Sequence, residues 1–197
     1  MLRGTVKKWD KPGQKPTLQN QISSLRAQVN RQKPETQYFR ANGSHTSPAT
    51  GSTITNYLPT DSLISSANFR DNVTGDKWIN KFLKLRLFAD GDCEFLRVIV
   101  YFPKKSGTRF APASRESVAI PDPSSFWVLS DQMITEKDSS GVFHYTHTYN
   151  LRNKVTLYDS NASSIERGEL VVCVISNAKT ASTYQYSYGW ELAYQNK

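Results

Sequence analysis

The chain has 197 residues, 38% hydrophobic and 12% aromatic, so it is long enough for one compact domain with a core and is not a disordered polymer as a whole. Its net charge of +8 is unevenly spread, because residues 1–40 hold nine Lys or Arg against two acidic residues and the rest is nearly neutral. No apolar run approaches the ~20 residues of a membrane-spanning helix, and no apolar signal-peptide segment follows Met1. A basic arm on a neutral body is typical of proteins that bind a polyanion, although a solvated tail or a targeting sequence has the same composition.

Residues 17–32 have the apolar spacing of a helix. The stripe consists of Leu18, Ile22, Leu25 and Val29. Its steps of four, three and four residues put these side chains on one face, and Pro16 and Pro34 bound the segment. Such a narrow stripe is typical of a helix that packs against copies of itself; the alternative is a marginal helix that docks on its own domain or does not form. We therefore predict a basic, partly helical arm over residues 1–35, followed by a separate domain over residues 36–197.

The domain beyond the arm consists of short β-type runs separated by clusters of Gly, Pro, Asn, Asp and Ser. The predicted strands are Gln37–Arg40, Ser52–Leu58, Trp78–Phe88, Glu94–Phe102, Phe126–Leu129, Val142–Tyr149, Lys154–Tyr158, Leu170–Ser176 and Tyr184–Tyr194. Many short strands without a convincing helix between them predict an all-β sandwich or a closed barrel.

Two strands have informative patterns. In residues 83–87, leucines alternate with Lys84 and Arg86, which predicts a strand with one buried face. Residues 170–175 are apolar throughout, which predicts either a central strand buried on both faces or one under a subunit contact. The segment Lys104–Pro123 is expected to be a long surface loop, a kind that usually carries contacts.

The order of these runs resembles the single jelly-roll coat proteins of satellite tobacco necrosis virus and of circular Rep-encoding single-stranded DNA viruses. The resemblance spans roughly the whole chain and rests on six segments. Two come early: Arg31–Phe39 after the arm, and Gly75–Ile79 leading into Lys84–Leu87, which is similar to the turn and long strand that begin the second sheet. The others are Phe95–Tyr101, Phe126–Asp131, Asn150–Asp159 and the closing Gly189–Tyr194. It implies an all-β, eight-stranded antiparallel jelly-roll sandwich.

The resemblance also implies a function: a capsid protein that assembles with itself into a T=1 icosahedral shell of sixty subunits, with the arms directed inward to a packaged single-stranded genome. The genome would be DNA, with RNA as the alternative, and the protein would be found in the virion and, during assembly, in the host nucleus. The sequence gives no indication of the host receptor. This arm lacks the Arg-rich blocks of circoviruses, so we expect cations of an inward-facing sheet to contribute, with Lys84, Arg86 and Arg97 as candidates.

The candidate nucleic-acid-binding residues combine the arm with that sheet. They are Arg3, Lys7, Lys8, Trp9, Lys11, Lys15, Arg26, Arg31, Lys33, Arg40, Lys84 and Arg86. Trp9 lies among lysines, so it could stack on an unpaired base or anchor the arm to the inner wall. Trp78, Trp127 and Trp190 are expected in the core or at subunit contacts.

No catalytic motif is found in the sequence, and we expect neither an enzyme nor a cofactor. His144 and His147 are three apart on a predicted strand, a spacing that puts them on opposite faces. The acidic turn with Asp90, Asp92 and Glu94 could hold calcium, but it is also the composition of a plain hairpin tip. The two cysteines, with no metal-ligand spacing, are expected to be buried free thiols, and a disulfide stays open.

Two other functions fit the same features less completely. One is a single-stranded nucleic-acid-binding protein that never forms a shell, for which a basic arm is equally suitable. The other is a lectin-like jelly-roll binding module, in which the neutral body would carry a ligand cleft. No membrane insertion is expected.

Overall fold

The computed structural model describes residues 18–31, 35–47, 52–62, 77–90, 93–112, 118–159, 164–178 and 184–196. Its contacts divide the chain into two units, Met1–Pro34 and Glu35–Lys197. The elements are α1 (Leu18–Arg31), β1 (Thr36–Ser47), β2 (Ser52–Tyr57), β3 (Lys77–Ala89), β4 (Cys93–Pro103), β5 (Phe126–Ile134), β6 (Phe143–Tyr158), β7 (Ile165–Arg167), β8 (Val171–Ala178) and β9 (Tyr184–Asn196).

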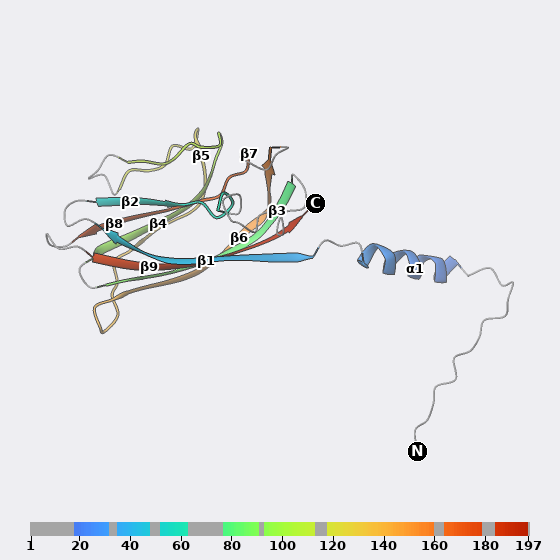
Figure 1. Ribbon diagram of the computed structural model, residues 1–197, viewed down its shortest axis with the longest axis horizontal. Coiled ribbons are helices and arrows are strands. Elements are labelled where there is room, and N and C mark those ends of the chain that lie inside the picture. The colour runs from blue at the N-terminus through green and yellow to red at the C-terminus, as the bar shows by residue number, and fades with distance from the viewer. Residues whose placement is uncertain are drawn as a thin grey trace, which may run out of the picture. The chain divides into compact units, whose positions relative to one another are not determined.

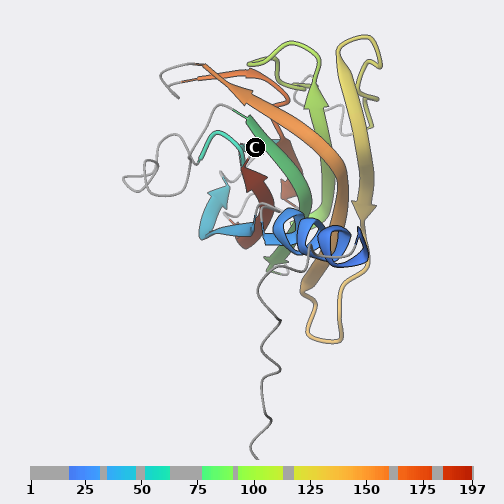
Figure 2. The same ribbon diagram turned by 90° about the vertical axis from the view of Figure 1, so that its right-hand side faces the viewer.

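The strands of the second unit form two antiparallel sheets that lie as two layers (Figure 1). The five-stranded sheet has the order β1-β9-β3-β6-β7, and the four-stranded sheet has the order β2-β8-β4-β5. Figure 2 shows β5, in yellow, beside β4. Each sheet pairs strands far apart in sequence, and the chain crosses repeatedly between the layers, which is the connectivity of a jelly roll. The predicted fold is confirmed: eight strands make the jelly roll, and β7 adds a ninth at one edge.

Strand β3 explains why the five-stranded sheet has one buried face. Leu83, Leu85 and Leu87 are buried in the core between the sheets, whereas Lys84 and Arg86 point the other way. Burial of each leucine contributes about 1.5–3 kcal/mol, so a shift of register by one residue would be strongly disfavoured. The predicted alternation is confirmed.

Strand β8 is central and buried on both faces, as one of the two predicted alternatives had it. Val172 and Val174 belong to the core between the sheets. Val171, Cys173 and Ile175 belong to a second apolar cluster on the outer face of the four-stranded sheet. Phe110 and Ala119 of the loop between β4 and β5 pack against this cluster. The segment predicted as a surface loop therefore also covers the outer face of the four-stranded sheet.

Several connections differ from the sequence-based prediction. The runs predicted as Val142–Tyr149 and Lys154–Tyr158 form one strand, β6, because its pairing with β3 resumes after an irregularity at Arg152 and Asn153. Strand β3 lies in the same sheet as β1 and does not begin the second sheet. The acidic turn after Ala89 is no hairpin tip, because β3 and β4 belong to different sheets. Strand β7 was not predicted, since three residues show no period.

The N-terminal unit contains α1, within two residues of the predicted bounds. Leu18, Ile22 and Leu25 of the apolar stripe are exposed. The helix has no acidic residue in its first turn, and no helix among the described residues is long and apolar enough to span a membrane.

Candidate nucleic-acid interface

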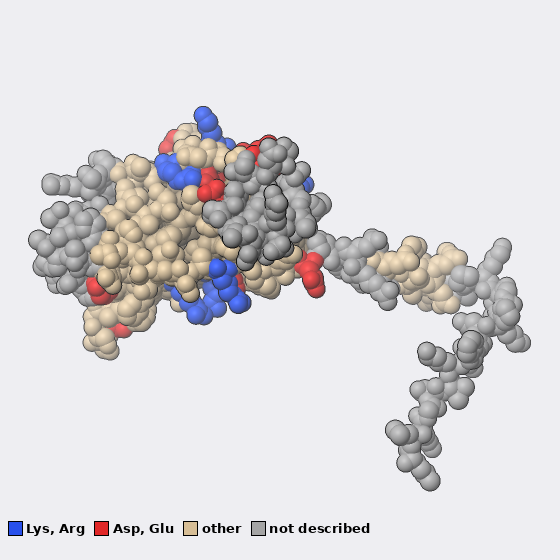
Figure 3. Space-filling view, in the orientation of Figure 1, with Lys and Arg blue, Asp and Glu red and all other residues tan. Residues whose placement is uncertain are grey.

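Three of the predicted basic residues meet on the outer face of the five-stranded sheet. Arg40 of β1 and Lys84 of β3 both lie opposite Glu191 of the intervening β9, and Arg86 lies opposite Gly189 two residue pairs further along. These residues line a shallow depression of about 510 Å³. Figure 3 shows Lys and Arg side chains projecting from the lower edge of the body, on the side where Figure 1 draws this sheet. The sheet thus brings together cations from positions 40 and 84–86.

The charge of this cationic face is only partly balanced. Glu191 forms an ion pair with Arg40, whose side chain is 75% exposed. Lys84 and Arg86 form no hydrogen bond or ion pair with any residue that the structure describes. Thr148 and Thr146 of β6 lie opposite these two cations and are exposed. Cations beside hydroxyl groups can bind phosphate oxygens, but they do not read bases.

Arg97 does not belong to this face, so the prediction that it is an available cation beside Lys84 and Arg86 is wrong. It lies on β4 of the four-stranded sheet and is 5% exposed. Its guanidinium donates to Asp131 Oδ1 at 2.7 Å and to the carbonyl oxygen of Ala119 at 2.9 Å. The arginine therefore joins β4 to β5 and to the covering loop, because a guanidinium can be buried only where its donors are paired.

Few of the predicted binding residues of the arm lie among the residues that the structure describes. Arg26 is exposed on α1, and Arg31 lies in the last turn of that helix. The other predicted arm residues lie outside the described residues; they are Arg3, Lys7, Lys8, Trp9, Lys11, Lys15 and Lys33. Their role stays a prediction from the sequence.

The two described residues of the acidic turn each have a partner in the protein. Asp90 accepts a hydrogen bond from the backbone N–H of Gln185 at 3.1 Å, and Glu94 accepts one from the amide of Asn177 at 3.1 Å. Asp92 lies outside the described residues. Within the described parts of the chain, no group of three or more His, Cys, Asp or Glu side chains could hold a metal ion.

The cysteines are free and buried, as predicted, and they belong to different clusters. Burial raises the pKa of the Cys93 thiol to about 11 and that of Cys173 to about 12. Both are therefore protonated and poorly nucleophilic at neutral pH. His144 contacts the carboxylate of Asp138 at 2.9 Å, and the His147 ring packs against Tyr149.

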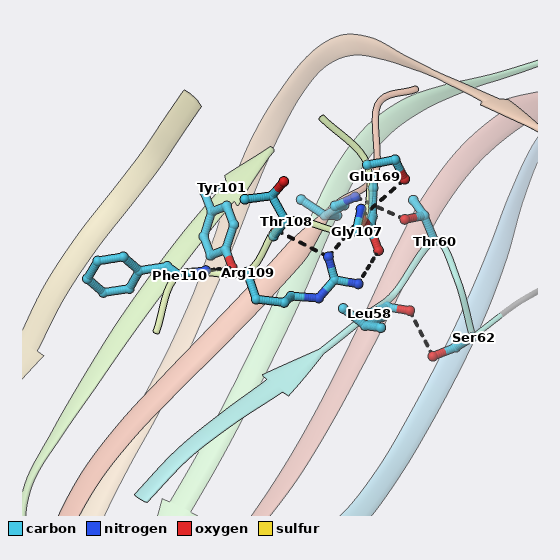
Figure 4. A network of polar contacts seen from close by, with 11 residues as sticks. Leu58, Thr60, Ser62, Tyr101, Gly107, Thr108, Arg109, Phe110 and Glu169 are labelled. Atoms are coloured by element: carbon cyan, nitrogen blue, oxygen red, sulfur yellow. Dashed lines mark hydrogen bonds and ion pairs between the residues drawn. The ribbon is translucent and has the colours of Figure 1, made fainter. Parts of the chain in front are cut away.

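A buried ion pair, which the sequence did not reveal, fixes the covering loop to the sandwich (Figure 4). Glu169 is 3% exposed and accepts two hydrogen bonds from the guanidinium of Arg109, at 2.6 and 2.9 Å. The backbone N–H of Gly107 donates to the same carboxylate at 2.9 Å. Nearby, the Tyr101 hydroxyl accepts a hydrogen bond from the backbone N–H of Phe110 at 2.9 Å. All these contacts join protein to protein, so the cluster is a structural clamp.

The sequence also gave no signal for a second basic region. Lys77, Lys104, Arg152, Lys154 and Arg167 line one groove although they come from well-separated segments of the chain. No pattern in a single segment could have grouped them, because only the pairing of the sheets brings them together. Trp127, expected in the core or at a subunit contact, lines the same groove and is 51% exposed.

Comparison with known proteins gives no match to a family model and none to a curated protein. Among solved structures, the decameric BFDV capsid protein is similar over 83% of this chain and 99% of its own, with 11% identity and a TM-score of 0.41. Desmodium yellow mottle tymovirus is similar over 97% and 95%, with 11% identity and a TM-score of 0.40. The top component of cowpea mosaic virus, described as naturally occurring empty particles, is similar over 78% and 82%, also with 11% identity and a TM-score of 0.40. At this level of likeness, function has to be inferred from the chain's own residues.

Proposed function

We propose that this chain is a viral capsid protein, which assembles with copies of itself into a small icosahedral shell and packages a single-stranded genome. The observation that carries the proposal is that different parts of the chain have different surfaces and charges. A neutral jelly-roll body has one outer face closed by its own loop and one open cationic face, and nearly all the excess charge lies in the N-terminal segment.

Packaging would be electrostatic and largely independent of sequence. Each Lys or Arg that neutralises a phosphate releases condensed counterions, and the gain depends on salt rather than on base identity. Lys84 and Arg86, without partners among the described residues, are available for such contacts. The arm lysines would add further phosphate contacts.

Self-assembly is supported by large apolar side chains left uncovered in the single chain. Val118 and Met133 are exposed near β5, and Leu18 and Leu25 are exposed on α1. The helix residues lie on one face and form an apolar stripe, which is the kind of surface that contacts other molecules. In the proposed particle, α1 would pack against its copies from neighbouring subunits.

The finer parts of the proposal follow the resemblance stated for the sequence. They are a T=1 shell of sixty subunits, a genome of DNA rather than RNA, and a location in the virion. The genome type would be decided by the nucleic acid recovered from assembled particles.

Negative-stain electron microscopy of the purified full chain at near-physiological salt tests the proposal. We expect uniform spherical particles of one small size. Monomers or small oligomers at every salt concentration and pH would overturn it and would favour a single-strand-binding protein that forms no shell.

A further inference from the structure

A basic groove runs between the two sheets at one edge of the sandwich. It has a volume of about 800 Å³ and shares no lining residue with the cationic face of the five-stranded sheet. One wall comes from the ends of β4 and β5, and the other from β3, β6 and β7. The lining consists of Lys77, Phe102, Pro103, Lys104, Trp127, Arg152, Asn153, Lys154, Val155, Leu157, Arg167 and Gly168.

The groove is strongly and one-sidedly charged. Five of these lining residues are Lys or Arg and none is Asp or Glu. Lys77, Arg152 and Arg167 form no side-chain hydrogen bond or ion pair with the described residues. Burial and the nearby Arg167 guanidinium lower the pKa of Lys154, because both disfavour its charged form. Uncompensated like charges in a concave site favour an anionic ligand.

The backbone around the groove is shaped in ways that ordinary strands avoid. Arg152 and Asn153 have φ angles of 51° and 57°, in the left-handed region that non-glycine residues rarely adopt. Lys81 donates a hydrogen bond to the side chain of Asn153 at 2.9 Å. At Gly168, with φ of 77°, an added Cβ would lie 2.0 Å from the carbonyl oxygen of Val155. Only glycine lets β7 approach β6 so closely, and this approach brings Arg167 near Lys154.

An apolar hollow of about 560 Å³ adjoins the groove. Lys104 and Trp127 line both. The rest of its lining is Ile120, Pro121, Pro123, Phe126, Val128 and Asp131. Ile120 is 83% exposed, and the Asp131 carboxylate is already bound by Arg97. The hollow therefore offers a mostly apolar surface beside a concentration of positive charge, and its one carboxylate is already paired.

We propose that the groove and the hollow together bind one nucleotide of a single-stranded nucleic acid. The phosphates would lie in the basic groove, and the base would lie in the apolar hollow against Trp127. Lys154, whose ammonium group lies over the Trp127 ring, would turn toward a phosphate and free the ring for the base. A sulfated sugar fits less well, because its hydroxyl groups would find few partners in the hollow.

Photo-crosslinking of the full chain to a deoxyuridine hexamer that carries 5-iodouracil tests this site. Mass-spectrometric mapping should place a crosslink on the peptide that contains Trp127. In fluorescence anisotropy with a labelled thymidine hexamer, Trp127→Leu should weaken binding about tenfold. Lys154→Gln should lower the slope of log affinity against log salt by about 0.7, the value for one phosphate contact on a single strand.

Lys105→Gln is the matched control, because it removes the same charge at a nearby exposed position. Lys105 does not line the groove and takes no part in the clamp around Glu169. It should leave the crosslink at Trp127 in place and the hexamer affinity nearly unchanged. Crosslinks confined to the arm and to β3 and β9 would overturn the site. If Trp127→Leu weakens binding of a heparin hexasaccharide as much as it weakens binding of the thymidine hexamer, the assignment of the ligand as a nucleotide is overturned. A change in oligomeric state of Trp127→Leu, with unchanged hexamer affinity, would make this face a contact between copies instead.

Discussion

The two sheets have the same alternation on the inside but opposite outer faces. On the four-stranded sheet, the outward residues include Ile99, Tyr101 and Val171, and the loop between β4 and β5 covers them. On the five-stranded sheet, the outward residues include Lys84 and Arg86, and among the described residues nothing pairs with them. One outer face extends the core, and the other is left open to a partner.

This difference explains the two sequence patterns. A strand buried on both faces is apolar at every position, as β8 is, whereas a strand buried on one face alternates, as β3 does. It also separates structural charges from available ones. Arg97 and Arg109 lie on the covered side and are bound to carboxylates, so they stabilise the fold, while the cations of the open face do not.

The largest expected effect is on the covered side. Arg109→Ala would leave the buried Glu169 carboxylate without its guanidinium, and we expect a loss of about 3–5 kcal/mol in the free energy of unfolding. Urea denaturation followed by circular dichroism measures it. The control Lys105→Ala, at a nearby exposed position, should change the free energy by no more than about 0.5 kcal/mol. Equal effects of the two would show that the clamp does not hold the loop.

Neighbouring residues of β3 sharpen the comparison within one strand. Leu85→Ala removes a fully buried side chain between the sheets and should cost about 2–5 kcal/mol. Arg86→Ala, on the open face, should cost less than about 0.5 kcal/mol. The same denaturation experiment distinguishes them. A destabilisation by Arg86→Ala as large as that by Leu85→Ala would mean that the open face is packed after all.

The buried thiols report on the four-stranded sheet. Because burial raises the pKa of Cys93 to about 11 and of Cys173 to about 12, from 9.0, both should resist alkylation by iodoacetamide at pH 8. The stability that comes from these raised pKa values is fully present below pH 9. It falls as the pH rises from 9 through the pKa values of the folded protein, because the thiols of the unfolded chain ionise first. Rapid alkylation in the folded state, compared with a sample in urea, would contradict their burial.

Charge removal from the open face should leave stability nearly unchanged but affect nucleic acid. For Lys84→Gln with Arg86→Gln, we expect less nucleic acid in purified assemblies, and binding that responds less to salt. Absorbance at 260 and 280 nm measures the content. Lys105→Gln with Lys137→Gln, which line neither this face nor the basic groove, is the control for charge alone.

Neutralising the arm at Lys7, Lys8, Lys11 and Lys15 together should also reduce nucleic-acid content and its salt sensitivity. Unchanged content in assembled particles would remove the arm from packaging and leave the sheet as the contact surface.

Local patterns in the sequence predicted most of the fold, because alternation in β3 and continuous burial in β8 are written in neighbouring residues. They did not predict what long-range pairing decides. The union of two runs into β6 depends on β3, and the burial of Arg97 depends on Asp131 and on a loop more than twenty residues away in the chain. The basic groove was missed for the same reason, since its five cations come together only in the folded sandwich.

The most direct test of the open and covered faces is a cryo-electron microscopy map of the assembled full chain. We predict that the outer face of the five-stranded sheet, with Lys84 and Arg86, lines the interior of a closed particle beside density for nucleic acid. A map with the covered, four-stranded side facing the interior would contradict this account.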